Sequence, residues 1–237
     1  MTQQRLKDRI ALITGASRGI GRAVALAYAR EGAHVVLVAR TVGGLEEVDD
    51  EIRELGSSAT LVPMDLGDGK KVDGLGPTIY QRWGKLDIVV GNAAILGPSS
   101  PITHVSDADW QEAIDINVTA NWRLIRTVDP LLRMSDAGRA IFVTSGAAQS
   151  AKAYRGPYSV TKAALDAMVK TYGAEVAATN VKVNLLSPGP TATAMRAQAM
   201  PGEDPATLPQ PEDLAELFIE LARPDCTRHG EIVRYSR

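Results

Sequence analysis

Short apolar runs alternate with longer stretches in which apolar residues recur every three to four positions, and this alternation continues along the whole chain. Several of the short runs are apolar on both faces, as expected for parallel strands that helices cover on each side. Seven strands are predicted, at Ile10–Thr14, His34–Ala39, Thr60–Met64, Leu86–Val90, Ala140–Thr144, Val181–Leu186 and Glu231–Arg234. This regular change from strand to helix predicts an α/β fold, a doubly wound parallel sheet with helices on both faces.

The helices between these runs differ in how clearly the sequence marks them. Apolar positions of the first helix repeat on one face, and Gly32 can end that helix. Ser106–Asp109 has the pattern of an N-terminal cap and predicts one long helix towards Met134. The helix expected over Asp68–Trp83 is the weakest, because three glycines and a proline interrupt it.

One segment departs from this alternation of strand and helix patterns. Pro188–Pro211 contains six of the 13 prolines and few branched apolar residues. It follows a strand, at the edge of the sheet where open α/β folds bind their ligands. Two interpretations are open: a flap over a bound ligand, or a surface loop without a function.

Composition narrows the class of protein. The chain has 237 residues, of which 45% are hydrophobic, so one domain over residues 1–237 is expected. A formal charge of −2 gives no basic excess for nucleic acid, and no apolar run is long enough to cross a membrane. The N-terminal residues contain no apolar signal segment and Cys226 is the single cysteine, so we expect a cytoplasmic protein. The histidines His34, His104 and His229 lack metal-ligand spacing, and no metal site is predicted.

The first strand runs directly into a glycine-rich turn, Thr14–Gly21. Gly15 permits a tight turn, while Gly19 and Gly21 let phosphate oxygens approach the backbone. The helix that follows points unpaired N–H groups and the positive end of its dipole at the same place. The turn therefore predicts a pyrophosphate site; the alternative is a glycine-rich loop without a ligand.

The end of the second strand indicates which dinucleotide is preferred. A carboxylate there would bind the ribose 2′-hydroxyl and select NAD(H), but this chain has Ala39-Arg40-Thr41. Arg40, together with Arg18 from the glycine-rich turn, offers guanidinium forks suited to a 2′-phosphate. We therefore predict NADP(H) over NAD(H); the alternative is that both arginines are ordinary surface residues.

Four polar residues form a candidate catalytic set. Tyr158 and Lys162 lie four positions apart, on one face of a predicted helix. Ser145 follows the strand Ala140–Thr144, at the ligand-binding edge of the sheet. Asn117 lies within a predicted helix, an unfavourable place for asparagine unless its side chain has a partner.

These residues resemble, in order and spacing, the short-chain dehydrogenase/reductase family in its short single-domain branch. The motifs that carry the resemblance are Thr14–Gly21, Asn92-Ala93-Ala94, Asn117, Ser145, Tyr158 with Lys162, and Pro188-Gly189. The similarity extends from Arg9 to about Arg234. It implies a Rossmann-like NAD(P)-binding domain with a substrate flap at about residues 188–211. It also implies a homodimer or homotetramer, because helices such as those around Trp110–Met134 and Tyr158–Ala177 pair subunits in this family.

The resemblance also implies a role for each matching position. Tyr158 would be the general acid and base, Ser145 would hold the substrate oxygen, and Lys162 would bind the nicotinamide ribose. Asn117 would carry a water that links Lys162 to solvent. Contacts to the cofactor are expected from Gly15, Ser17, Arg18, Gly19, Ile20, Gly21, Arg40, Asp65, Leu66, Asn92, Tyr158, Lys162, Pro188, Gly189, Thr191 and Thr193.

Elementary electrostatics indicates how such a site would work. A phenol with a pKa of about 10 is too weak a base at neutral pH, and lowering that pKa by about three units takes roughly 4 kcal/mol. An ammonium at about 4 Å supplies about that much at an effective dielectric constant near 20. We therefore expect Lys162 to lower the pKa of Tyr158.

These residues are compatible with two functions and disfavour a third. The favoured one is an NADPH-dependent carbonyl reductase or alcohol dehydrogenase acting on a small molecule. The alternative from another class is a sensor or scaffold that binds NADP(H) without turnover. A nucleotide-sugar epimerase is disfavoured, because that branch has a larger C-terminal substrate domain. Neither Pro188–Pro211 nor the loop Ile95–Pro101 contains a charged cluster, which favours a neutral, partly apolar carbonyl substrate.

Overall fold

A parallel sheet forms the centre of the computed structural model, which describes residues 4–236. The order of its seven strands is β3-β2-β1-β4-β5-β6-β7, so the chain winds outward from β1 in both directions. The strands are β1 (Ile10–Thr14), β2 (His34–Ala39), β3 (Ala59–Pro63), β4 (Ile88–Gly91), β5 (Arg139–Val143), β6 (Lys182–Ser187) and β7 (Ile232–Arg234). The predicted doubly wound α/β fold is thus confirmed, and each predicted strand overlaps an observed one.

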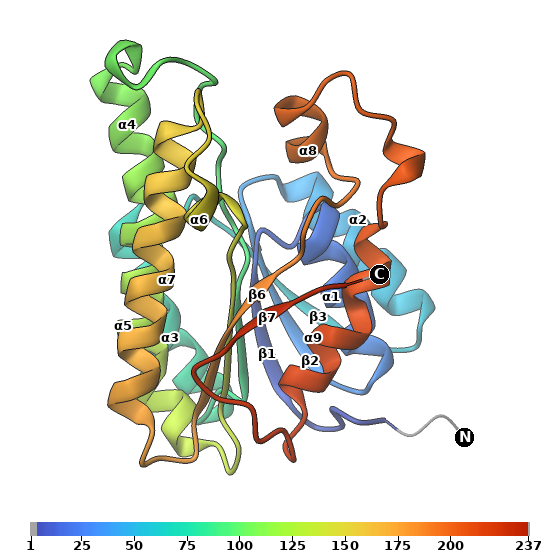
Figure 1. The fold of residues 1–237 in the computed structure, drawn as a ribbon. Coiled ribbons are helices and arrows are strands. Elements are labelled where there is room, and N and C mark those ends of the chain that lie inside the picture. Colours follow the sequence, from blue (N-terminus) through green and yellow to red (C-terminus); the bar gives the residue numbers. More distant parts are fainter. Residues whose placement is uncertain (1–3, 237) are drawn as a thin grey trace.

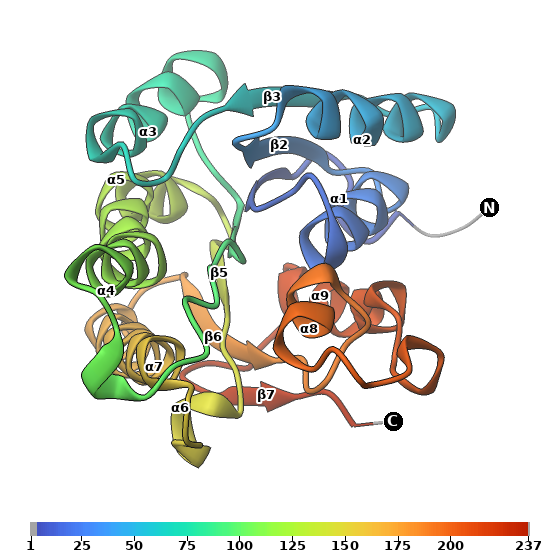
Figure 2. The ribbon, with the colours of Figure 1, turned by 90° about the horizontal axis from the view of Figure 1, so that it is seen from above.

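Helices cover both faces of this sheet (Figures 1 and 2). One face carries α1 (Gly19–Arg30), α2 (Val42–Glu54) and α9 (Ala215–Ala222). The other carries α3 (Gly69–Trp83), α4 (Asp107–Ile114), α5 (Ala120–Met134) and α7 (Gly156–Val176). Alternate residues of each inner strand point to opposite layers: Ile13 packs in the cluster on the α1 side and Leu12 in the cluster on the α7 side. Strand residues are therefore apolar on both faces.

All seven strands are parallel, so their carboxyl ends lie along one edge of the sheet. The short helices α6 (Ala147–Ser150) and α8 (Ala194–Ala199) lie beyond this edge, at the top of Figure 1. The short turns η1 (Ile102–His104), η3 (Pro205–Thr207) and η4 (Pro211–Leu214) complete the connections. Within the described residues, no helix is both long and apolar enough to span a bilayer.

At the opposite edge of the sheet, the buried carboxylate of Asp87 holds neighbouring segments together through hydrogen bonds. Asp87 is fully buried and accepts hydrogen bonds from the Ile10 backbone (2.9 Å) and the Arg9 guanidinium (3.0 Å). Lys85 also reaches it, at 2.9 Å. Burial by itself would raise the pKa of Asp87, but hydrogen bonds from Ser135 and Ile10 outweigh it and hold that pKa below its ordinary value.

Helix α3 corrects the expectation of a weak helix over Asp68–Trp83. It is continuous from Gly69 to Trp83 despite its glycines and Pro77. At Gly76 an added Cβ would lie 2.2 Å from the carbonyl oxygen of Thr127 on α5, and the Gly76 N–H donates to the Thr127 hydroxyl at 3.1 Å. The glycine that lowers helix propensity is therefore what lets α3 and α5 approach closely.

The helix expected from Ser106 towards Met134 is present, because α4, η2 and α5 follow one another without a break from Asp107 to Met134. The predicted cap is present, since the Ser106 hydroxyl accepts from the Asp109 N–H at 3.1 Å. Between α4 and α5, however, the π-helical segment η2 (Asp115–Thr119) inserts a wider turn. This turn contains Asn117, and π-bulges of this kind often accompany functional sites.

Candidate active site

The glycine-rich turn after β1 has the shape of a phosphate cradle. Gly15 and Gly19 adopt left-handed φ angles of 65° and 55°. At Gly21 a Cβ would lie 2.2 Å from the Gly15 carbonyl oxygen, so only glycine fits there. Helix α1 begins without a side-chain cap, because Arg18 at its N-cap makes no capping hydrogen bond. Its first N–H groups are therefore free of a side-chain partner, which fits a bound pyrophosphate.

Two exposed arginines stand beside this cradle. Arg18 lies at the N-cap of α1, and Arg40 directly follows β2. Neither forms a salt bridge within residues 4–236. Asp65 and Leu66 follow β3 at the same edge, where Asp65 accepts from the Gly67 N–H at 2.8 Å. The residues expected to contact the adenosine half thus lie on neighbouring strand ends.

Asn92 braces the cradle from the next strand. Its side-chain amide donates to the carbonyl oxygens of Thr14 (2.9 Å) and Gly15 (3.3 Å). The Thr14 hydroxyl in turn accepts from the N–H groups of Asn92 and Ala93. Ala94, where the family has glycine, is not among the residues with positive φ, so the alanine causes no backbone strain.

The catalytic candidates meet beyond β5. Ser145 follows that strand, and its hydroxyl is near enough to the phenol of Tyr158 on α7 to favour the phenolate. The Lys162 ammonium lies 5.8 Å from the centre of the Tyr158 ring. The spacing of four residues therefore places both groups on one helix face, as expected.

Lys162 is nearly completely buried, with 3% of its surface exposed. Its ammonium donates to the carbonyl oxygen of Val143 at 2.8 Å, at the end of β5. Burial lowers the pKa of Lys162 from 10.5 to about 8, and the negative charge of Asp166 acts in the opposite direction. The Asp166 carboxylate is itself held by the hydroxyl of Thr144.

The expected lowering of the Tyr158 pKa by Lys162 was wrong for this state of the protein. Burial raises the pKa of Tyr158, while Ser145 and the charge of Arg155 act against that rise. The Lys162 ammonium donates to the Val143 carbonyl oxygen and is itself driven towards its neutral form by burial. Spacing on the helix fixed the face, but not the direction of the side chain.

Asn117 has partners for every polar atom of its side chain. The amide oxygen accepts from the Ile95 N–H (2.8 Å), and the amide nitrogen donates to the Ile95 carbonyl (2.9 Å) and the Thr161 hydroxyl (3.0 Å). Its own carbonyl oxygen accepts from Asn121 at 2.9 Å. The side chain therefore joins η2 to the loop after β4 and to α7, and this explains an asparagine inside a helix.

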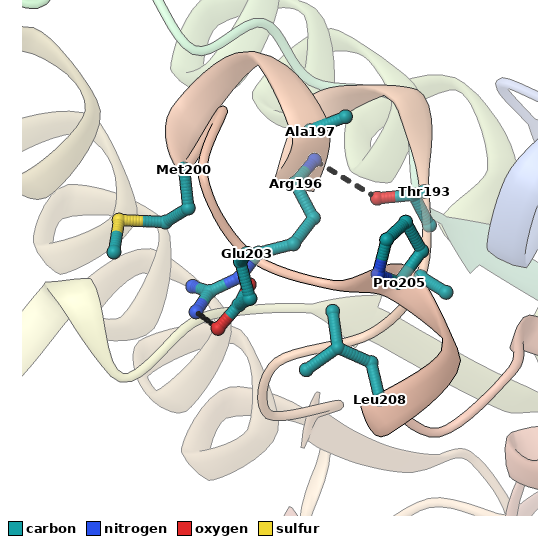
Figure 3. Close-up of a pocket in the computed structure, with 8 residues that line it drawn as sticks. Thr193, Arg196, Ala197, Met200, Glu203, Pro205 and Leu208 are labelled. Carbon is teal, nitrogen blue, oxygen red and sulfur yellow. Dashed lines mark hydrogen bonds and ion pairs between the residues drawn. The ribbon is translucent and has the colours of Figure 1, made fainter.

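The segment after β6 folds over the same edge of the sheet. Pro188 and Thr191 are buried, and Gly189 has a φ of 69°. Thr193 caps α8, since its hydroxyl accepts from the Arg196 N–H at 3.1 Å. The segment closes on itself around a cavity of about 20 Å³, across which Arg196 pairs with Glu203 (Figure 3).

The structure also brings in residues that the motif search passed over. Arg155 lies three positions before Tyr158, and Asp166 lies four after Lys162, so both share the face of α7 that holds the catalytic pair. The same i±3 and i±4 spacing that linked Tyr158 to Lys162 could have found them. Thr161, the partner of Asn117, lies three positions after Tyr158, so the same spacing could have found it.

Comparison with known proteins agrees with this geometry. A model of the short chain dehydrogenase family matches residues 9–204. The chain is 37% identical over 229 residues to the uncharacterized oxidoreductase YciK of Escherichia coli K12, which covers 95% of this chain and 90% of that protein. It is 33% identical over 196 residues to the 2,3-dihydro-2,3-dihydroxybenzoate dehydrogenase of Bacillus subtilis, covering 83% of this chain and 75% of that one.

Solved structures give the same result. A short chain dehydrogenase of Salmonella enterica serovar Typhi superposes with a TM-score of 0.94 at 34% identity, covering 99% of this chain and 98% of that one. A second structure, from Escherichia coli CFT073 and complexed with NADPH, has a TM-score of 0.94 at 35% identity and covers 99% of both chains. These proteins share the fold over almost its whole length.

Proposed function

The chain belongs to the short-chain dehydrogenase family, and we propose that it is an NADPH-dependent oxidoreductase acting on a small carbonyl or alcohol compound. The observation that carries the proposal is the meeting of Tyr158, Ser145 and Lys162 at the carboxyl edge of the sheet. A phenol near a hydroxyl and a buried ammonium is suited to moving a proton to or from a substrate oxygen.

NADPH is proposed as the cofactor because the residues present fit it. Gly15 and Gly21 leave no room for a side chain, and the first turn of α1 has no side-chain cap. Arg18 and Arg40 are exposed and have no acidic partner within residues 4–236. The similar protein complexed with NADPH supports the same choice. Thr191, Thr193 and the Pro188-Gly189 turn would lie on the nicotinamide side.

When bound, the cofactor would supply or accept the hydride. In the reducing direction the Ser145 hydroxyl donates a hydrogen bond to the substrate oxygen, and Tyr158 gives its proton to the same oxygen as negative charge develops there. In the oxidising direction the Tyr158 phenolate takes that proton back. Lys162 would hold the nicotinamide ribose, and its positive charge favours the phenolate. Residues 188–211 would form the flap that excludes water.

The proposal is tested by following oxidation of NADPH with a panel of ketones, aldehydes and quinones, using wild type, Tyr158→Phe and Tyr80→Phe. Loss of the acid should reduce kcat/KM by about 10²-fold or more. Tyr80 is an exposed tyrosine on α3, so its variant is the matched control and should retain activity. Equal activity of wild type and Tyr158→Phe contradicts the proposed role. Tight NADPH binding with no turnover by any protein would favour the alternative, a non-catalytic sensor or scaffold.

Cofactor preference has its own test. Arg40→Asp replaces the proposed 2′-phosphate ligand with a carboxylate that repels phosphate and can accept from a 2′-hydroxyl. The Kd for NADPH should rise by about tenfold or more, because one charge-assisted hydrogen bond contributes roughly 1.5–3 kcal/mol. The Kd for NADH should fall or stay unchanged. An unchanged NADPH affinity in titrations of cofactor fluorescence contradicts the assignment.

We further propose that the protein assembles into a homodimer or homotetramer through α5 and α7. Trp122 on α5 and Val160 on α7 are large apolar side chains that are 46% and 40% exposed in the isolated chain. Covering such side chains is a common reason for association. Light scattering at micromolar concentration checks this, and the mass of a monomer would contradict it.

A further inference from the structure

We propose that Arg155 is a positioning residue that latches residues 188–211 against α7 and, in this closed arrangement, keeps a cation beside the Tyr158 phenol. The inference rests on the proposed function, because it concerns the acid–base group of that reaction. It assigns a role to a side chain outside the set of motifs from which the function was proposed.

The first observation is the contact between Arg155 and the end of α8. One guanidinium nitrogen donates to the carbonyl oxygen of Ala199 and lies 3.7 Å from the sulfur of Met200. Ala199 is the last residue of α8, so its carbonyl lacks a partner inside the helix and needs a donor from outside. Arg155 supplies that donor across a separation of 44 residues in sequence.

The other end of the segment lies over the phosphate cradle. An added Cβ at Gly19 would be 3.4 Å from the methyl group of Thr193, which means that the two residues lie side by side. The segment lies on the α1 side, above the carboxyl edge of the sheet (Figure 1), and the Arg155 side chain reaches its α8 end from the start of α7. Contact at both ends defines a closed arrangement, and Arg155 makes the contact on the α7 side.

The second observation is the position of Arg155 on its helix. Arg155 is the N-cap residue of α7, three positions before Tyr158 and seven before Lys162, so it stands at the entrance of the helix that carries both groups. Burial raises the pKa of Tyr158, and the positive charge of Arg155 is one of the two influences that oppose this. A guanidinium beside the phenol therefore favours the phenolate.

The neighbouring charges do not cancel this influence. Arg155 has no salt-bridge partner within residues 4–236. On α7, Lys162 lies beyond the phenol with the Asp166 carboxylate near it. On the flap, Arg196 is paired with Glu203.

The other nearby elements add no acid. On α6, Gln149 accepts from Arg234 of β7 at 3.2 Å. The acceptors that hold Arg155 are both neutral, a carbonyl oxygen and a thioether. Its charge remains available to the phenol.

The third observation is strain in the backbone just before Arg155. Tyr154 has a φ of 65° and Ala151 a φ of 41°, in the left-handed region that side chains other than glycine rarely adopt. The Tyr154 side chain is 60% exposed, so burial does not compensate for its backbone conformation. Strain of this kind persists where the surrounding structure requires it, and here it sets the direction in which Arg155 enters α7.

Three variants separate the two parts of the proposal. Arg155→Met removes the charge and the donors but keeps an apolar stem, and Arg155→Lys keeps the charge but loses the planar fork. Lys170→Met removes an exposed cation from α7, more than two turns beyond Lys162, and is the matched control. Hydrogen exchange of the amides of residues 194–200, with and without NADPH, reports the latch. It should rise about tenfold in Arg155→Met, rise less in Arg155→Lys and stay unchanged in Lys170→Met.

The effect of the Arg155 charge is measured by the ionisation of Tyr158 itself. Each protein is titrated with alkali, and its near-ultraviolet phenolate absorbance is compared with that of the same protein carrying Tyr158→Phe. Arg155→Met should move the midpoint upward by about half a unit to one unit, with Arg155→Lys in between and Lys170→Met at the wild-type value. The pH profile of kcat/KM for alcohol oxidation should move in the same direction, because the phenolate is the active form.

Neither the hydrogen-exchange measurement nor the titration of Tyr158 needs turnover. The role of Arg155 can therefore be refuted independently of the proposed function. Absence of activity in every protein would count against the proposed function and leave these readouts valid. Faster exchange without a shift in the Tyr158 midpoint overturns the pairing of latch and charge. So does a shift without faster exchange, and so does an equal response of Lys170→Met.

Discussion

Replacing Lys162 with methionine should abolish hydride transfer and yet stabilise the cofactor-free protein at neutral pH. The side chain is 3% exposed, and burial lowers its pKa from 10.5 to about 8. At pH 7 the ammonium is still protonated, so the fold bears the cost of a buried charge. Methionine has a similar length, retains the packing and carries no charge.

The magnitude follows from the two pKa values. Their difference of about 2.5 corresponds to roughly 3 kcal/mol of folding free energy at about 1.4 kcal/mol per unit. Against this, methionine leaves the Val143 carbonyl oxygen without its 2.8 Å donor, at a cost of about 1–2 kcal/mol. The net gain at pH 7 is therefore about 1–2 kcal/mol. In a chain of this size each kcal/mol raises Tm by about 2–4 °C.

The dependence on pH has a defined sign. Because the folded pKa of about 8 lies below the unfolded value of 10.5, the unfolded wild-type chain binds more protons between these two pH values. Wild-type stability therefore rises with pH across that window relative to the variant. Above the unfolded pKa the penalty has disappeared, and the neutral amine that donates to Val143 should make wild type the more stable protein.

Urea unfolding of both proteins at pH 7 and at pH 10 tests this reasoning, without cofactor and with equal m-values as a condition. Lys170→Met, which removes an exposed lysine from the same helix, is the control and should change stability by less than about 0.5 kcal/mol. A Lys162→Met protein that is less stable than wild type at pH 7 would refute the account. So would a stability difference that is the same at both pH values.

Two further predictions concern the cradle and the opposite edge of the sheet. Gly21→Ala should lose NADPH binding in fluorescence titrations and about 3 kcal/mol of stability in urea unfolding, because its Cβ would lie 2.2 Å from the Gly15 carbonyl oxygen. Gly74→Ala on α3, where a Cβ meets nothing within 4 Å, is the control and should gain about 0.5–1 kcal/mol. Asp87→Asn should cost about 3–5 kcal/mol, because it leaves the buried Arg9 guanidinium without this carboxylate. Since the pKa of Asp87 is lowered on folding, wild type should lose this contribution as pH falls through that pKa, and the variant should show a weaker dependence on acid.

The strands could be predicted because their signal is local. Ile10–Thr14 and His34–Ala39 agree with the observed bounds residue for residue, since apolar runs that are buried on both faces have few other interpretations. The fourth strand begins at Ile88 although the apolar run begins at Leu86. Leu86 is buried outside the ladder, and the Asp87 side chain takes up the N–H of Ile10.

The errors arose where distant contacts decide local structure. Gly76 weakens α3 by propensity, but its value lies in the contact with Thr127, which is 51 residues away. The wide turn at Asn117 depends on partners at Ile95 and Thr161. None of these contacts leaves a periodic pattern, so the long helix after Ser106 could be predicted but its π-helical turn could not.

The candidate site shows the same division between what spacing determines and what it does not. Spacing placed Tyr158 and Lys162 on one helix face, and a parallel sheet brought Ser145 to the same edge. The direction of the Lys162 ammonium depends on the carbonyl oxygen of Val143, which no spacing rule includes. The effect of burial on both pKa values could not be judged before the depth of the site was known.

Burial acts on the two titratable groups of this site in opposite directions, and this determines where activation must come from. It raises the pKa of Tyr158 and lowers the pKa of Lys162, so each group is driven towards its uncharged form. A phenolate beside an ammonium is the pair that the proposed chemistry needs, and burial alone opposes both charges. The Ser145 hydrogen bond and the Arg155 charge act in favour of the phenolate. Because Arg155 also holds the end of α8, the same side chain links closure of residues 188–211 to the basicity of Tyr158.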